Sequence, residues 1–145
     1  MTPLPDHKQH LYHDAVWVVV DPWQTDSERD NYVAEQIYQY IKHHNITNVK
    51  VLNNHRDNTH HLFEEFELLP YKVKVNNLKE NNIVFVGFHN GICIKNKGTA
   101  TYSRDERTRV KNLYVKMDLV STLPNDGVYD FYGAYSSYGE GVQLI

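Results

Sequence analysis

The sequence predicts an α/β fold, a three-layer αβα arrangement in which a mostly parallel sheet carries helices on both faces. Two short runs without polar side chains, Ala15–Val20 and Ile83–Phe88, are rich in β-branched and aromatic residues, which is typical of strands buried on both sides. Segments with helical periodicity alternate with these and with further strand-like runs. Such alternation favours parallel strands that are joined by crossover helices.

The first third of the chain is expected to supply a lead-in, a helix and a second strand. Residues 1–14 are polar and contain two prolines, so we expect an irregular segment there. Asp26 or Ser27 can cap a helix that continues to about Lys42 with apolar side chains on one face. Val49–Leu52 then forms a short strand that ends in polar residues.

The middle of the chain is expected to add a short helix and an edge strand. Thr59 or Asn58 can cap the helix, and Pro70 ends it. The apolar residues of this helix are Leu62, Phe63, Phe66 and Leu69. Tyr71–Val75 alternates apolar and polar residues, which indicates a half-exposed strand at the edge of the sheet.

The last third is expected to contain a polar helix around Thr99–Lys111, a strand at Leu113–Val120 and a tail over residues 124–145. The tail is rich in Tyr and Gly and has no clear period. Tyr is frequent at protein interfaces, so the tail serves either as a contact in a homo-oligomer or as a cover for the sheet edge. A length of 145 residues indicates a single domain, residues 1–145.

Composition excludes several classes of function. The net charge is -3, and no basic stripe interleaved with aromatic residues is present, so we expect no nucleic-acid partner. The longest apolar runs are far too short to span a bilayer, and the first residues do not resemble a signal peptide. A single Cys allows no intrachain disulfide. Together these features predict a cytoplasmic protein that does not bind membranes.

Three polar clusters follow the ends of predicted strands: Asp21–Gln24, Asn53–Asp57 and His89–Cys93. In parallel sheets with helices on both faces, ligands bind beyond the carboxyl ends of the strands. The sequence therefore predicts a small-molecule site where these clusters meet.

Cys93 and Asp21 are the two residues of these clusters that carry chemistry. Cys93 follows a buried strand and a Gly-containing turn, where a helix start would favour its thiolate; it is either a nucleophile or a small buried apolar residue. Asp21 is either a general base or a turn-initiating residue before Pro22. Their occurrence at the ends of two strands that we expect to be neighbours favours a joint catalytic role.

His55, His60 and His61 raise the question of a metal, because His is a frequent metal ligand. No Cys or Glu completes an obvious ligand set around His55 and His60, so these residues are weak candidates and we expect no metal. The pair Gly87 and Gly91 is too sparse for a dinucleotide fingerprint, and we expect no cofactor.

Two stretches resemble the isochorismatase-like cysteine hydrolases, the superfamily that includes nicotinamidases and N-carbamoyl amidohydrolases. Val16–Gln24 is similar to the first strand of the family and the Asp that ends it. Ile83–Ile94 is similar to the strand, glycine turn and Cys that follow later in the family. The order of elements agrees over about residues 14–124, and the chain is a shortened member on this reading.

The resemblance implies a Cys nucleophile, an Asp general base and a Lys that stabilises the charged intermediate. Cys93 and Asp21 take the first two roles. Lys74 is our choice for the third, with Lys72 and Lys79 as the alternatives, because the interval in which the family carries its Lys is much shortened here.

The resemblance also implies a cis peptide between Phe88 and His89. The backbone N–H groups of His89 and Cys93 would then form an oxyanion hole. Trp23 and Phe88 would flank a small planar substrate, and Asn90 would replace the usual Thr of the family's turn.

Three functions are left open by the sequence. The leading one is a cysteine-dependent hydrolase that cleaves an amide or related C–N bond of a small molecule. The alternative is a catalytically inactive binding or assembly module, which the shortened Lys region favours. The third is a metal-dependent enzyme, but Asn53 stands where nicotinamidases carry a metal-binding Asp, and His55 and His60 have one residue too many between them.

Overall fold

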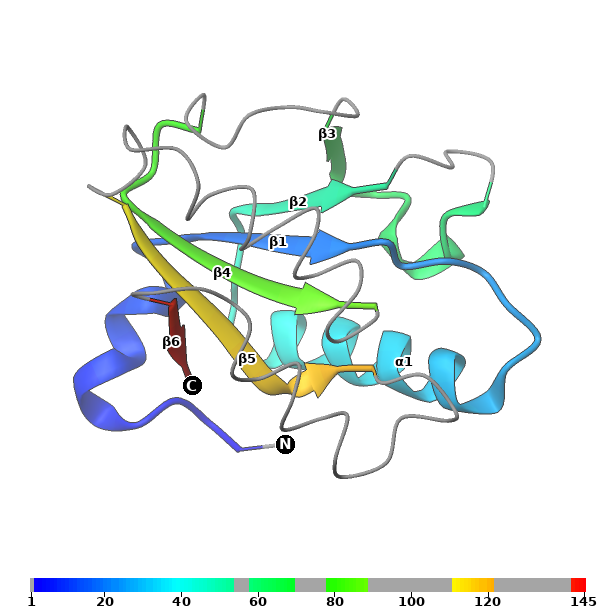
Figure 1. The fold of residues 1–145 in the computed structure, drawn as a ribbon, viewed down its shortest axis with the longest axis horizontal. Helices are drawn as coiled ribbons and strands as arrows, with labels where there is room; N and C mark the ends of the chain where they lie inside the picture. Colours follow the sequence, from blue (N-terminus) through cyan, green and yellow to red (C-terminus); the bar gives the residue numbers. More distant parts are fainter. Residues whose placement is uncertain (1, 54–57, 70–77, 89–110, 122–141) are drawn as a thin grey trace.

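The computed structural model describes residues 2–53, 58–69, 78–88, 111–121 and 142–145. Six strands form one sheet in the order β3-β2-β1-β4-β5-β6, and every neighbouring pair is parallel (Figure 1). In chain order the elements are η1 (Asp6–Tyr12), β1 (Val16–Val20), α1 (Glu28–His43), β2 (Val49–Leu52), η3 (His61–Phe63), β3 (Glu67–Leu69), β4 (Asn82–Gly87), β5 (Asn112–Val120) and β6 (Val142–Leu144).

The central strands β1 and β4 are buried on both faces, as their apolar sequences predict. Trp17 and Val19 of β1 join a core cluster with residues of η1 and α1, and this is the α1-side face. Val16, Val18 and Val20 point to the opposite face and join a second cluster with residues of β4 and β5. The parallel α/β fold predicted from the sequence is therefore confirmed.

Helix α1 lies along one face of the sheet (Figure 1), and its start is defined by a side-chain cap. The Ser27 hydroxyl accepts a hydrogen bond from the Asp30 N–H at 3.2 Å, so Ser27 and not Asp26 is the cap. Ala34, Ile37 and Ile41 are buried on the sheet-facing side. These residues recur at helical spacing, which is why this element was predictable.

The prediction of an irregular lead-in over residues 1–14 is wrong for its second half. Residues Asp6–Tyr12 form the 3-10 helix η1, which buries Leu11 and Tyr12 against the α1-side core. The Leu11 carbonyl accepts a hydrogen bond from the indole N–H of Trp17 at 2.9 Å. Burial of these two side chains stabilises a helix that the polar composition of the segment does not predict.

Two further predictions are corrected at the sheet edges. Residues Leu62–Leu69 do not form a helix: η3 is one 3-10 turn capped by His60, not Thr59 or Asn58, and Leu69 belongs to β3. Pairing with β2 overrides the helical spacing of the apolar residues. At the other end of the chain, Val142–Leu144 adds β6 to β5, so part of the tail is regular.

The remaining predictions divide into those that the structure tests and those that it does not. The strands expected at Val49–Leu52, Ile83–Phe88 and Leu113–Val120 are confirmed as β2, β4 and β5. The edge strand at Tyr71–Val75 and the helix at Thr99–Lys111 lie outside the described residues, apart from Lys111 itself. Within the described part of the chain, no helix combines the length and hydropathy needed to cross a membrane.

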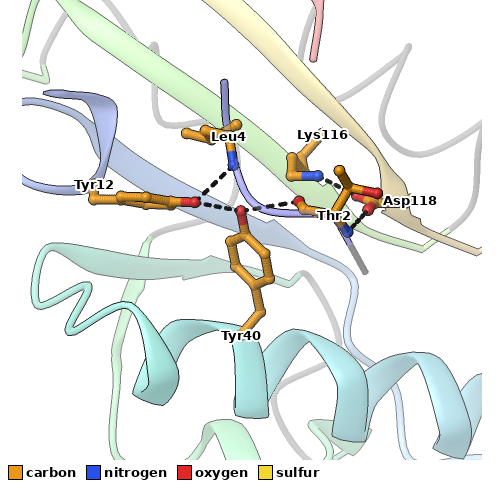
Figure 2. Close-up of polar contacts among 6 residues, drawn as sticks. All are labelled: Thr2, Leu4, Tyr12, Tyr40, Lys116 and Asp118. Atoms are coloured by element: carbon orange, nitrogen blue, oxygen red, sulfur yellow. Dashed lines mark hydrogen bonds and ion pairs between the residues drawn. The ribbon is translucent and has the colours of Figure 1, made fainter. Parts of the chain in front are cut away.

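The N-terminal segment is held against α1 and β5 by a group of polar contacts that runs from the buried Tyr12 and Tyr40 hydroxyls to the exposed Thr2 and Asp118 (Figure 2). The hydroxyls of Tyr12 and Tyr40 lie 2.8 Å apart, and the Leu4 N–H donates to the Tyr12 hydroxyl at 2.8 Å. The Thr2 N–H donates to the Asp118 carboxylate at 2.8 Å. The N-terminal network consists of Thr2, Leu4, Tyr12, Tyr40, Lys116 and Asp118.

Candidate functional site

The carboxyl ends of β1 and β4 lie side by side in the middle of the sheet. Val20 pairs with Gly87, and the Phe88 N–H donates to the Val20 carbonyl at 2.8 Å. Gly87 has a φ of 120°, and a Cβ at this position would lie 2.3 Å from the Val20 carbonyl oxygen. Only glycine permits this approach, so the chain leaves β4 in close contact with the end of β1.

Asp21 directly follows β1 and is fully buried, with 0% of its surface exposed. Its φ of 47° lies in the left-handed region, which Asp tolerates better than most residues but still at a cost. Its N–H donates to the Leu52 carbonyl at 2.9 Å, which ties it to the end of β2. A strained, buried carboxylate at a strand end is a feature that clusters at functional sites.

The loops that follow β1 and β2 are joined by a chain of side-chain hydrogen bonds. The indole N–H of Trp23 donates to Asn53 Oδ1 at 2.9 Å, and Asn53 Nδ2 donates to the Thr59 hydroxyl at 2.8 Å. Trp23 and Thr59 also form an isolated antiparallel bridge, and the His60 N–H donates to the Pro22 carbonyl at 2.7 Å. The orientation of the half-buried Trp23 ring is therefore fixed.

A second buried carboxylate, which the sequence analysis missed, lies at the same edge of the sheet. Asp30 of α1 accepts hydrogen bonds from the hydroxyls of Ser121 and Thr25, each at 3.1 Å. Ser121 follows β5, and its N–H donates to the Gly87 carbonyl at 2.9 Å. Asp30 and Ser121 are 91 positions apart, so no local sequence pattern indicates their contact.

The predicted site residues divide between those that the structure describes and those that it does not. Asp21, Trp23 and Phe88 are described, and the first two border the site edge. The Phe88 side chain is fully buried in the α1-side core, so it has no surface to offer a substrate. The predicted residues that lie outside the described ranges are Cys93, His89, Asn90, Lys72, Lys74 and His55.

Lys79, one alternative for the catalytic lysine, lies at the wrong end of the sheet. It is exposed and precedes the amino end of β4, whereas Asp21 lies beside the carboxyl end. A strand of this length spans roughly 15–20 Å, which is beyond the reach of a lysine side chain. Of the three candidates, only Lys72 and Lys74 remain.

His60 is buried at the site edge and has a structural role. Its Nδ1 accepts the Leu62 N–H at 3.3 Å, and its ring stacks on His61 at a centroid distance of 4.5 Å. Burial lowers the pKa of His60, and the neighbouring His61 lowers it further, although Glu35 opposes the shift. The neutral ring that accepts the Leu62 N–H is therefore the favoured form.

Comparisons with known proteins place the fold. Neither a scan against protein families nor a search of curated protein sequences gives a match. Among solved structures, the chain is similar to the pyrazinamidase of Pyrococcus horikoshii in complex with zinc, with 12% identity, a TM-score of 0.53, and coverage of 91% of this chain and 98% of that one. It is also similar to a putative Mar1 ribonuclease from Leishmania major, with 15% identity, a TM-score of 0.56, and coverage of 90% and 77%. The chain therefore shares its α/β fold, with a parallel central sheet, with these two structures.

The described residues do not fit a zinc ion. Among them, no three His, Cys, Asp or Glu side chains gather closely enough to hold a metal. The Asn53 amide uses its oxygen for Trp23 and its nitrogen for Thr59, and His60 Nδ1 caps η3. Both side chains already serve the packing of the two loops.

Proposed function

We propose that this protein is a cysteine-dependent hydrolase that cleaves an amide or related C–N bond of a small molecule. The observation that carries the proposal is the buried Asp21 carboxylate beside the point where the chain leaves β4. Cys93 follows Gly87, the last residue of β4, by only six positions in the sequence, and in the proposal it supplies the thiol at the edge that holds this carboxylate. Similarity of fold to a pyrazinamidase supports the same class of chemistry.

The proposed reaction has two steps that use the same base. Asp21 takes the proton of the Cys93 thiol, and the sulfur attacks the carbonyl carbon of the substrate. The C–N bond breaks, and the amine leaves with the proton that Asp21 returns. Asp21 then deprotonates a water molecule, which cleaves the thioester and restores the thiol.

The negative charge that develops on the carbonyl oxygen of the substrate must be stabilised by hydrogen-bond donors. The N–H groups of His89 and Cys93 take this role in the proposal, and Lys74 or Lys72 supplies a positive charge. Trp23, whose N–H is already used by Asn53, would present its ring to a planar substrate. A buried base in a low-dielectric setting interacts strongly with the reacting groups, which fits the position of Asp21.

The test is hydrolysis of a panel of small amides, including pyrazinamide, nicotinamide and N-carbamoyl compounds. Hydrolysis is measured as the release of ammonia. We expect activity on at least one compound, loss of it in Cys93→Ala, and a loss of at least about a hundredfold in Asp21→Asn. Lys79→Ala, a change at the opposite end of the sheet, is the matched control and should retain activity.

Labelling of Cys93 by iodoacetamide gives an independent check, because the chain has no other thiol. The proposal expects faster labelling than that of a free thiol. Activity that survives Cys93→Ala would refute the proposal. A panel without turnover, combined with slow labelling, would instead support an inactive binding or assembly module.

A further inference from the structure

We infer that Asp30 and Ser121 are positioning residues for this site, which hold the end of β4 in place relative to Asp21. The inference rests on the proposed function, and both residues act on the site through the backbone at the end of β4. It follows from a series of hydrogen bonds that leads from the buried Asp30 carboxylate to Val20, the residue before Asp21.

The series begins at Asp30 in the first turn of α1. Its side chain is 9% exposed, and its Oδ1 accepts the Ser121 hydroxyl at 3.1 Å. Ser121 is 1% exposed. A hydrogen bond to a buried carboxylate is stronger than one between neutral groups, so this contact holds the end of β5 firmly against α1.

From Ser121 the series continues through one peptide group to β1. The Ser121 N–H donates to the Gly87 carbonyl at 2.9 Å, and the Phe88 N–H donates to the Val20 carbonyl at 2.8 Å. The peptide that joins Gly87 to Phe88 is therefore held on one side by β5 and on the other by β1. Asp21 is the next residue after Val20, and the segment that leads to Cys93 begins after Phe88.

Pairing between β4 and β5 is irregular just before this point, which gives the contact with Asp30 a specific task. Phe85 pairs with Val115, but Gly87 pairs with Val120, so β5 contains extra residues between the two positions. An irregularity of this kind disrupts the ladder of hydrogen bonds, so the alignment of β5 with β4 is less firmly set beyond it. The bond from Asp30 to Ser121 fixes the strand again where it holds Gly87.

Helix capping does not account for this use of Asp30. In the usual capping box, the acidic side chain at this position returns to the N–H of the cap residue. Here the Ser27 N–H donates to the Thr25 hydroxyl at 3.2 Å, and Asp30 Oδ1 is directed to β5. Thr25 donates to the other oxygen of Asp30, so the two hydroxyls can be removed separately.

The experiment compares Ser121→Ala with Thr25→Ala in the full chain. p-Nitrophenyl acetate acetylates a reactive thiol, and the first-order loss of the acetyl group from Cys93 is followed by intact mass spectrometry between pH 5 and 9. Cys93→Ala supplies the background. In the wild type, we expect the rate of deacetylation to reach a plateau as the pH rises. Without the Asp21 base, the rate should instead keep rising with hydroxide concentration.

For Ser121→Ala we expect deacetylation to be at least about tenfold slower, because a small displacement of a base lowers the rate by a large factor. The dependence of this rate on pH should approach that of Asp21→Asn. The deacetylation rate of Thr25→Ala should stay within about twofold of the wild-type rate, although this variant should lose about as much thermal stability as Ser121→Ala. Asp30→Asn should follow Ser121→Ala, and it replaces that variant if Ser121→Ala does not fold.

An equal slowing in Ser121→Ala and Thr25→Ala would overturn the inference, since the role would then be structural alone. So would wild-type deacetylation in Ser121→Ala and Asp30→Asn. If Asp21→Asn itself deacetylates like the wild type, the proposed function fails instead. The two failures are therefore distinguishable.

Discussion

Helix α1 takes part in two polar networks that hold different parts of the chain in place. Asp30 in its first turn joins the carboxyl ends of β5 and β4, whereas Tyr40 near its last turn belongs to the N-terminal network (Figure 2). The two residues are separated by about 15 Å along the helix axis. The first network holds strand ends that carry the candidate site, and the second holds the start of the chain.

The networks also differ in backbone strain. Asp21 and Gly87, at the carboxyl edge, both have positive φ values, of 47° and 120°. The N-terminal network contains no such residue among its members and consists of hydrogen bonds and the ion pair between Lys116 and Asp118. Of these two regions, only the edge with the candidate chemistry contains residues with positive φ; the other such residue described, Asn45 with a φ of 54°, follows the end of α1 and belongs to neither.

The largest effect is expected for Gly87→Ala. The new Cβ would lie 2.3 Å from the Val20 carbonyl oxygen, and φ is unfavourable for any L side chain. We expect a loss of about 3 kcal/mol or more in the free energy of unfolding, or failure to fold. Chemical denaturation followed by circular dichroism measures this. A loss below about 1 kcal/mol would show that the close approach of β1 and β4 is not as described.

A smaller effect is expected for Tyr12→Phe in the N-terminal network. The change leaves the buried Leu4 N–H without its acceptor and removes the contact with the Tyr40 hydroxyl. We expect a loss of about 1–3 kcal/mol in the free energy of unfolding and an unchanged rate of Cys93 labelling by iodoacetamide. A change in that rate would contradict the separation of the two networks.

The smallest effect is a pH dependence that both ends share. Burial lowers the pKa of His44, which stacks on Tyr12, and the charges of His43 and Lys116 lower it further; burial likewise lowers the pKa of His60. A His with a depressed folded-state pKa binds fewer protons when folded than when unfolded, so stability falls as the pH drops below about 6.5.

Thermal unfolding at pH 7.5, 6.5 and 5.5 measures this dependence. His44→Gln and His60→Gln should each reduce the drop in melting temperature between pH 7.5 and 5.5, whatever they do to stability at pH 7.5. An unchanged drop in both variants would show that neither imidazole is held in its neutral form.

The sheet was predictable because its strands are nearly free of polar residues. The runs in β1 and β4 identified both central strands and, with the rule for parallel sheets, the edge where Asp21 lies. Residues Glu67–Leu69 were misassigned, because their apolar spacing fits a helix and only pairing with β2 makes them a strand. Local patterns do not contain such long-range pairing.

The candidate site was predictable only where a residue directly follows a strand. Asp21 and Trp23 met that condition, whereas Asp30 contacts the site through Ser121, 91 positions away. Phe88 also follows a strand, but its ring turns into the α1-side core and not toward the site. The direction of a side chain after a strand depends on the local backbone, which the sequence pattern did not reveal.

The decisive question for this protein is whether Asp21 acts as a base toward Cys93. Cys93 is acetylated with p-nitrophenyl acetate in the wild type and in Asp21→Asn, and the mass of each protein is followed after removal of the reagent. We expect the wild type to return to its unmodified mass, whereas Asp21→Asn should stay acetylated on Cys93 for at least about a hundredfold longer. Equal rates of deacetylation in the two proteins, both folded, would contradict this role of Asp21.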